Sequence, residues 1–139
     1  PLKVPISVDI TTGDKITPKE INYKLSLLFE DREIEVLAYN LETILAEKLE
    51  TILSRGIVNT RARDFYDVYM LYNLYKDKIN YSYLKNAIIS TTKKRNTLYI
   101  LDDYKNILSQ ILENSDVVNL WNRYKESFNY VKKSLSRKV

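Results

Sequence analysis

The 139-residue sequence predicts an α+β fold in which a small antiparallel or mixed sheet is followed by a helical bundle. In the first 39 residues apolar and polar side chains alternate, which is the period of a half-buried strand. After residue 40 the apolar side chains recur every three to four residues, which is the period of a helix. All the predicted strands therefore precede all the predicted helices, and this order is typical of an α+β fold rather than of a βαβ alternation.

Length and composition fit a single globular domain. A chain of 139 residues has the usual size of one domain, and its 2 glycines and 3 prolines favour helices. We expect residues 1–39 to form a sheet segment, residues 40–78 to form core helices, and residues 79–139 to form a C-terminal helical region. Because the sequence begins with Pro1 rather than with Met, we also expect it to be part of a longer protein.

The absence of two residue types restricts the possible chemistry. The sequence has no cysteine and no histidine, which excludes disulfide scaffolds, thiolate or histidine metal sites, and catalytic triads that contain either residue. Any catalysis must use Asp, Glu, Lys, Arg, Tyr, Ser or Thr, with oxygen ligands for a metal. No apolar run approaches the roughly 20 residues that span a bilayer, and no signal peptide is present. We therefore expect no membrane partner and a cytoplasmic location.

The charge balance is moderately basic. The sequence has 22 Lys and Arg residues against 18 Asp and Glu residues, a net charge of +4, and 12 tyrosines. Cations interleaved with aromatic rings suit an anionic partner such as RNA. Solvated helix ends and core tyrosines account for the same composition, so the charge alone does not identify a partner.

Three strands are predicted in the first segment. Residues 2–10 alternate strictly between apolar and polar, with Pro5 placing this strand at an edge or bulge. A second extended stretch is expected over residues 23–29 and a third over residues 33–38.

Five helices are predicted after the strands. Asn40 is a good cap for a helix over residues 41–55, and Gly56 ends it. The next helix, over residues 60–75, is apolar nearly all the way round, and we expect it to lie deep in the fold. Three amphipathic helices complete the prediction, over residues 81–92, 101–113 and 117–135.

Lys48 lies in the middle of the apolar stripe of the first helix. Burying an ammonium without a partner costs several kcal/mol, so we expect a carboxylate or a ligand phosphate to meet Lys48. Arg55 projects from the same face two turns later. In the alternative interpretation the Lys48 side chain reaches past its neighbours to water. The acidic residues of this helix lie away from the centre of the stripe: Glu42, Glu47 and Glu50.

Two aspartates are further candidates. Asp64 shares the packed side of the second helix, and two antiparallel helices would bring it near Lys48 at a polar pocket. Asp9 lies on the polar side of the first predicted strand, where a carboxylate suits a divalent metal. Alternatively, Asp64 is an ordinary first-turn aspartate that favours the helix dipole, and Asp67 is open to the same interpretation. The alternative for Asp9 is a solvent-facing strand residue.

Three sequence motifs resemble those of one protein family. They are Val-Asp-Ile around Asp9, E-x-x-L-A-E-K-L over residues 42–49, and R-x-R-D-F-Y-D over residues 61–67. Together they resemble the second half of the AbiEii/AbiGii nucleotidyltransferase toxin family.

The resemblance implies a fold, an activity and a site. The fold would be that of the C-terminal part of a polymerase-β-like nucleotidyltransferase. Asp9 would be a metal-site carboxylate for Mg²⁺, Lys48 would face the nucleotide phosphates, and Asp64 would orient Lys48 or complete the pocket. Arg55 and Arg63 would also bind the nucleotide. The implied reaction, within an abortive-infection system for phage defence, transfers a nucleotide from an NTP to an acceptor such as the 3′ end of tRNA, and a cognate antitoxin is implied as a partner.

One family motif is missing from the sequence. Gly-Ser followed by Asp-x-Asp, which supplies the main metal ligands in the family, is absent, because no glycine precedes Gly13. We therefore expect the chain to be the C-terminal portion of such an enzyme and to be inactive alone. The alternative is a non-catalytic module that binds RNA or an antitoxin, and a helical DNA-binding protein ranks third because no recognition helix is evident.

Overall fold

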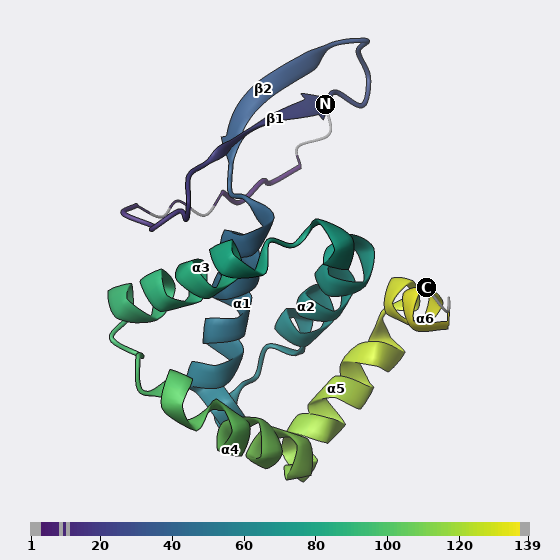
Figure 1. Ribbon diagram of the computed structural model, residues 1–139. Helices are drawn as coiled ribbons and strands as arrows, with labels where there is room; N and C mark the ends of the chain where they lie inside the picture. The colour runs from purple at the N-terminus through teal and green to yellow at the C-terminus, as the bar shows by residue number, and fades with distance from the viewer. Residues whose placement is uncertain (1–3, 9, 11, 137–139) are drawn as a thin grey trace.

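The computed structural model describes residues 4–8, 10 and 12–136, and these residues form a two-stranded sheet and six α-helices (Figure 1). The α+β order predicted from the sequence is confirmed. Two short 3-10 turns, η1 (Gly56–Val58) and η2 (Lys76–Lys78), follow α1 and α2. The strands and helices are β1 (Ile21–Ser26), β2 (Glu33–Ala38), α1 (Leu41–Arg55), α2 (Ala62–Tyr75), α3 (Tyr81–Lys94), α4 (Ile100–Glu113), α5 (Ser115–Ser127) and α6 (Asn129–Ser136).

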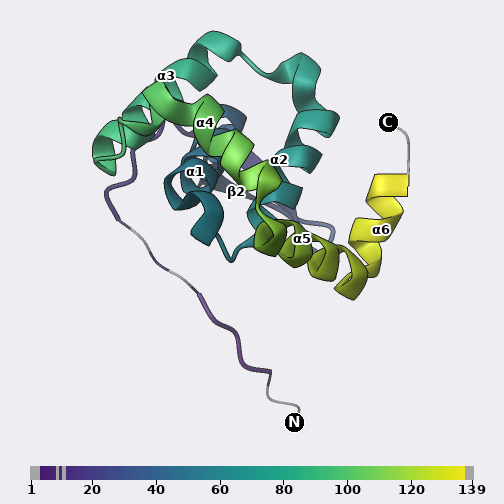
Figure 2. The same ribbon diagram turned by 90° about the horizontal axis from the view of Figure 1, so that it is seen from below.

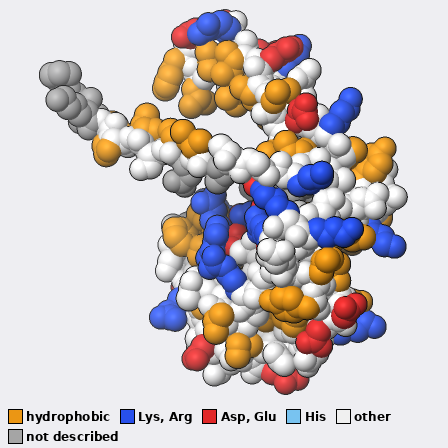
Figure 3. Space-filling view, turned by 90° about the vertical axis from the view of Figure 1, so that its left-hand side faces the viewer, with side chains coloured by type: hydrophobic (Ala, Val, Ile, Leu, Met, Phe, Trp, Pro, Cys, Tyr) orange, Lys and Arg blue, Asp and Glu red, His pale blue; other side chains and the backbone are white. Residues whose placement is uncertain are grey.

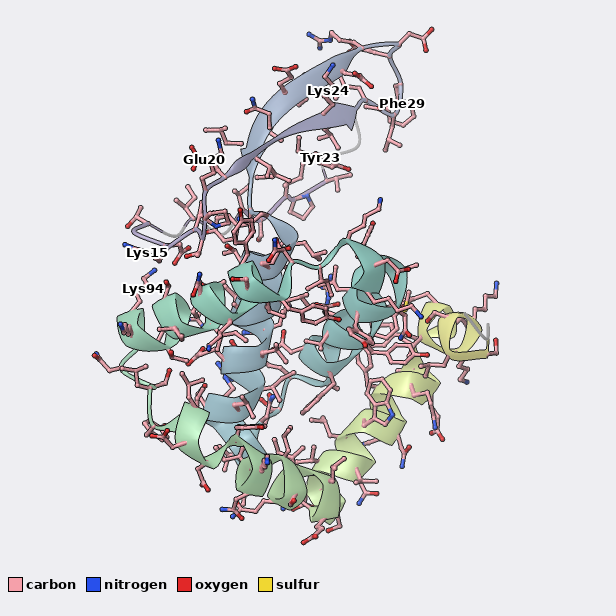
Figure 4. All side chains as sticks on the ribbon, in the orientation of Figure 1. Lys15, Glu20, Tyr23, Lys24, Phe29 and Lys94 are labelled. Atoms are coloured by element: carbon pink, nitrogen blue, oxygen red, sulfur yellow. The ribbon has the colours of Figure 1, made fainter. Side chains whose placement is uncertain are left out.

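The two strands form an antiparallel hairpin that projects from the helices (Figure 1). One face of the hairpin consists of three apolar cross-strand pairs: Ile21 with Ala38, Tyr23 with Val36, and Leu25 with Ile34. Phe29, in the turn, is 96% exposed. Figure 3 shows hydrophobic side chains gathered over this projecting arm, and Figure 4 shows Tyr23 on the arm and Phe29 near its end.

The first two predicted strands differ from the structure. Residues 4–8 and 10 form no strand and are exposed, so the prediction of a strand over residues 2–10 is wrong for the described part of that segment. The backbone of a strand needs a neighbouring strand for its hydrogen bonds. The two described strands pair with each other, so residues 4–8 and 10 have no strand partner among the described residues. β1 begins before residue 23 and ends at Ser26, because the bond from Leu27 N–H to the Arg32 carbonyl closes the turn there (3.0 Å).

Helix α1 has the bounds that the sequence predicts, because both of its ends carry local signals. The Asn40 side chain accepts a hydrogen bond from Thr43 N–H at 2.8 Å, and its amide donates to the carbonyls of Thr17 and Lys19, also at 2.8 Å. Gly56 ends the helix with a positive φ of 50°, which favours glycine.

The helices α2, α3 and α4 all pack against α1. Seen from below, α4 crosses near α1 and leads into α5, and α6 lies at the far end of α5 (Figure 2). Between α1, α4 and α5 the core contains Ile52, Ile111 and Val117, with Phe65 and Val68 of α2 packed against them. No helix in the described part of the chain is long and apolar enough to cross a membrane.

Two predictions about the helices are wrong. Helix α2 does not lie deep in the fold: only Ala62 and Asp64 are buried, and Leu74 is 56% exposed. The predicted helix over residues 117–135 begins two residues earlier and is broken at Phe128, whose extended backbone (φ −124°, ψ 111°) separates α5 from α6. After the break, Val131 of α6 is completely buried.

Candidate functional site

Lys48 binds two carboxylates of the neighbouring helix. Its Nζ donates a hydrogen bond to Asp64 Oδ1 at 2.8 Å and lies 2.8 Å from Asp67 Oδ2. Lys48 comes from α1, and both aspartates come from the first half of α2, three residues apart on one helical face. The sequence-based expectation that a carboxylate would meet Lys48, with Asp64 close by, is confirmed at the level of this contact.

Two arginines extend the cluster toward solvent. Arg61 Nε lies 3.1 Å from Asp64 Oδ2, and Arg63 Nε lies 3.8 Å from Asp67 Oδ2. Both arginine side chains are exposed, at 54% and 77%. We call these five residues the Lys48 cluster. Three cations against two carboxylates leave an excess positive charge, so the cluster attracts an anion.

Burial differs sharply between the members. The Asp64 side chain is only 2% exposed, whereas that of Lys48 is 25% exposed. Asp64 Oδ2 is buried and accepts no hydrogen bond from the described residues, since the approach of Arg61 has the distance but not the angle of a hydrogen bond. Asp64 is thus fixed inside the protein, and its carboxylate holds the Lys48 ammonium in position.

Lys48 remains charged at neutral pH. Burial by itself lowers the pKa of the Lys48 ammonium, but the hydrogen bonds and charges of Asp64 and Asp67 outweigh it, so that the pKa is raised above its ordinary value of 10.5. A lysine in this state acts as a fixed positive charge and not as a general base. An ammonium has three N–H donors, and two carboxylates occupy two of them. No described residue accepts the third, so within the described structure it is open to a ligand at the partly exposed tip.

The remaining predicted site residues lie at different distances from the Lys48 cluster or outside the described residues. Arg63 lies at the edge of the Lys48 cluster, through its contact with Asp67. Arg55 is exposed at the end of α1, and no contact joins it to the cluster in the described residues. Asp9 lies outside the described residues, so its predicted place next to Lys48 stays a prediction.

The described residues do not supply a magnesium site. No group of three or more carboxylates that could hold a metal occurs among residues 4–8, 10 and 12–136. Asp64 and Asp67, the two carboxylates of the cluster, are both directed at Lys48. A divalent ion would have to compete with the ammonium for them.

Sequence reasoning undervalued two members of the cluster. Asp67 was open to the interpretation of a simple first-turn charge, and Arg61 had no role of its own. The available signal was spacing, because residues three and four apart share a helix face, so that Arg61, Asp64 and Asp67 follow one another along α2.

The structure buries two of the acidic residues that lie away from the centre of the apolar stripe of α1. Glu50 is buried, and its carboxylate accepts hydrogen bonds from Arg95 and from Thr97 Oγ1, the latter at 2.9 Å. Glu42 is buried too, and it accepts a bond from Asn80 N–H at 2.8 Å. Because α1 is covered by α2, α3 and α4, it has more than one buried face, and a single apolar stripe does not reveal this.

A large hollow in the described structure lies apart from the Lys48 cluster. It has a volume of about 620 Å³, lies between α1, α3 and α4, and is lined mainly by leucine and isoleucine. Its chemistry suits an apolar contact and not a nucleotide phosphate.

A protein-family model matches nearly the whole chain. The family model described as "Nucleotidyl transferase AbiEii toxin, Type IV TA system" matches residues 1–137. Neither the curated proteins nor the solved structures contain a match to the chain.

Proposed function

The chain belongs to the AbiEii nucleotidyltransferase toxin family of type IV toxin–antitoxin systems, and from this premise we propose that the Lys48 cluster binds the phosphates of an NTP during nucleotide transfer to an RNA acceptor such as the 3′ end of tRNA. The proposal is supported above all by the position of Lys48, a charged ammonium between Asp64 and Asp67 whose partly exposed tip has a donor without an acceptor among the described residues. Membership in the family implies a cognate antitoxin as partner.

The proposed reaction is a phosphoryl transfer. An acceptor hydroxyl oxygen forms a bond to the α-phosphorus of the NTP, the bond from that phosphorus to the bridging oxygen breaks, pyrophosphate leaves, and the hydroxyl proton is released. Negative charge grows on the departing phosphates, and a preorganised ammonium opposite them stabilises the transition state. Lys48 would supply that charge, and Asp64 would keep it in place.

The arginines would contribute to binding the nucleotide. Arg63 lies beside Lys48 through Asp67, and its exposed guanidinium is free to turn toward a phosphate. For Arg55, exposed at the end of α1, a role in nucleotide binding stays a prediction. We also propose that Mg²⁺ accompanies the NTP and that Asp9 contributes to holding it. The described carboxylates do not fit such an ion, because Asp64 and Asp67 are both bound to Lys48.

A transfer assay tests the role of Lys48 and Asp64. Labelled NTP and tRNA are incubated with full-length protein carrying Lys48→Ala or Asp64→Ala, and we expect transfer to fall by on the order of a hundredfold or more. Lys105, a lysine on the exposed side of α4, is the matched control, and Lys105→Ala should transfer at the parent rate.

Folding must be separated from activity in this assay. Because Asp64 is buried, Asp64→Asn and Lys48→Arg are included as variants that keep the shape or the charge, and thermal melting shows that each variant is folded at the assay temperature. A folded Lys48→Met protein that transfers nucleotide at the parent rate would exclude the proposed role.

A non-catalytic module that binds RNA or an antitoxin is the second candidate. It is favoured by the two carboxylates that already neutralise Lys48 and by the lack of a three-carboxylate metal site in the described residues. Full-length protein that transfers no nucleotide from any NTP, yet binds RNA or antitoxin, would support this candidate instead.

A further inference from the structure

A hollow lined by cations and rings lies beside the Lys48 cluster. It has a volume of about 530 Å³ and lies between the start of α2 and the second half of α5. We call it the arginine hollow. No Asp or Glu lines it; the lining residues are Thr60, Arg61, Ala62, Arg63, Leu120, Arg123, Tyr124, Ser127 and Phe128.

The guanidinium groups of this hollow are largely unused. Arg123 is exposed, and its side chain forms no ion pair or hydrogen bond with the described residues. Arg61 uses only Nε toward Asp64, and Arg63 lies 3.8 Å from Asp67. Several N–H donors therefore belong to residues that border a hollow whose described lining contains no carboxylate, and such a lining suits phosphate groups.

A buried side chain next to the hollow has an unused donor. Asn59 is only 3% exposed; its Oδ1 accepts from Arg61 N–H at 2.8 Å, while its Nδ2 has no acceptor in the described residues. Asn59 lines a smaller hollow of about 190 Å³ that shares Thr60, Leu120 and Arg123 with the arginine hollow. A buried donor without an acceptor is costly, and a ligand oxygen entering here would satisfy it.

The start of α2 adds to the positive potential. This 14-residue helix has no side-chain cap at its N-terminus, next to Arg61. Free backbone N–H groups and the helix dipole favour an anion at such an end. Asp116, an exposed residue that lines the smaller hollow, opposes an anion there, so the arginine hollow is the better place for phosphates.

Aromatic rings form the other wall. Phe128 is 41% exposed and lies 4.9 Å from Tyr124, ring centroid to ring centroid. Tyr66, Tyr130 and Trp121 pack in the same aromatic group and contact these two rings. A partly exposed ring fixed by other rings is suited to stacking an unpaired base.

We propose that the arginine hollow binds a single-stranded RNA segment, with phosphates on Arg61, Arg63 and Arg123 and a base stacked on Phe128. Three separate guanidiniums on two helices match the successive phosphates of a strand better than the single phosphate chain of a nucleotide. Because Arg61 and Arg63 also belong to the Lys48 cluster, an RNA strand bound in this hollow extends toward Lys48. The inference rests on the proposed function for its choice of RNA, and it assigns the place where the acceptor strand is held.

Binding of a fluorescein-labelled RNA of about ten nucleotides, followed by anisotropy, tests the inference on the full-length protein. We expect Arg123→Gln to weaken binding about fivefold and to lower the slope of log affinity against log salt by about 0.7, the value for one contact to single-stranded phosphate. Phe128→Leu should weaken binding about fivefold or more through lost stacking. Arg32→Gln, which removes the same charge from the hairpin turn, is the matched control and should bind as the parent does.

Asn59→Asp separates ligand binding from folding. This change keeps the oxygen that accepts from Arg61 N–H and removes the unused donor. Because the new carboxylate is buried, we expect a lower melting temperature, so RNA affinity is compared at a temperature where the variant is folded, and there it should fall. Arg123→Lys, which keeps the charge, should restore the salt slope.

The outcomes distinguish this inference from the proposed function. Lys48→Ala should lose transfer and still bind the RNA, and Arg123→Gln should raise the KM for RNA while leaving the KM for NTP unchanged. Arg123→Gln and Phe128→Leu proteins that bind RNA as tightly as Arg32→Gln would overturn the inference, even if transfer still requires Lys48. RNA binding that requires Arg123, in a protein that transfers no nucleotide, would support the inference while the proposed function fails.

Discussion

Two charged residues of α1, Lys48 and Glu50, each bind partners from another segment, but in opposite ways. Glu50 is 3% exposed at its side chain, and both of its oxygens are occupied, by Arg95 and by Thr97. Lys48 is 25% exposed and has two carboxylate partners for three donors. The first group is closed to any ligand, and the second is open to one.

The difference shows how burial alone misleads in a search for function. Glu50 is more buried than Lys48, yet its contacts serve to join α1 to the segment that follows α3. Arg95 of that segment also contacts Glu47 of α1. On the same side of the molecule Lys94 reaches from the end of α3 toward the loop of Lys15, where it binds Asp14 (Figure 4). These contacts hold elements together. The Lys48 cluster instead combines a buried anchor, Asp64, with a lysine donor that no described residue accepts.

The largest effect on stability is expected at Glu50. Glu50→Ala removes a buried carboxylate and leaves Arg95 with one carboxylate partner, and we expect a loss of about 3 kcal/mol in the free energy of unfolding. Urea denaturation measures it. Glu113→Ala, at an exposed position at the end of α4, should change stability by less than about 0.5 kcal/mol. Equal effects at the two positions would contradict the structural role of Glu50.

Lys48→Met should have a smaller effect on stability, of about 2 kcal/mol. The change leaves Asp64 buried with only Arg61 beside it, but Lys48 was itself partly solvated. The double variant Lys48→Met/Asp64→Leu replaces both charges by apolar groups and should regain most of the loss. Thermal and urea denaturation of the single and double variants decide this. A double variant that is less stable than Lys48→Met would show that the pair is needed for folding.

Asp67→Asn tests the more exposed carboxylate of Lys48. The Asp67 side chain is 22% exposed and Lys48 keeps Asp64, so we expect a loss of less than about 1 kcal/mol. If the open donor of Lys48 serves a phosphate, the same change should leave transfer within about tenfold of the parent. Measuring both quantities on one preparation shows whether Asp64 alone positions the lysine. A loss of transfer as large as that of Asp64→Asn would make Asp67 equally necessary.

The smallest expected effect is the pH response of Glu47. Burial raises the pKa of Glu47 above its ordinary value of 4.5, although the Arg95 charge acts in the opposite direction. The folded protein therefore binds more protons than the unfolded chain above pH 4.5, and its stability falls as the pH rises through the folded pKa. Relative to Glu47→Gln, the parent should lose less than about 1 kcal/mol between acidic and neutral pH. A gain in stability over that interval would reverse the sign and contradict the raised pKa.

Local signals in the sequence were sufficient for most helices. Asn40 and Gly56 mark the two ends of α1, and the strand over residues 33–38 coincides with β2. The placement of Lys48 and Asp64 on packed faces also followed from helical periodicity alone. Such signals act within one or two turns, so the residues that carry them are close in sequence.

Features that depend on distant contacts were decided by the tertiary structure. The burial of Glu50 depends on Arg95, 45 residues away, and the exposure of residues 4–8 depends on the lack of a neighbouring strand in the described chain. The break at Phe128 depends on rings that pack against one another across α2, α5 and α6.

The candidate site shows the same division within five residues. The sequence determined that an ammonium and a carboxylate would lie on packed sides of two helices, because a period of 3.6 residues assigns each residue to a face. The packing of α1 against α2 decided that Asp67 would join Asp64 at Lys48, that Arg61 and Arg63 would border them, and that Arg55 would lie apart. The reason is geometric: an ion pair forms within about 4 Å, and a distance this short between two helices is set by their packing and not by either helix alone.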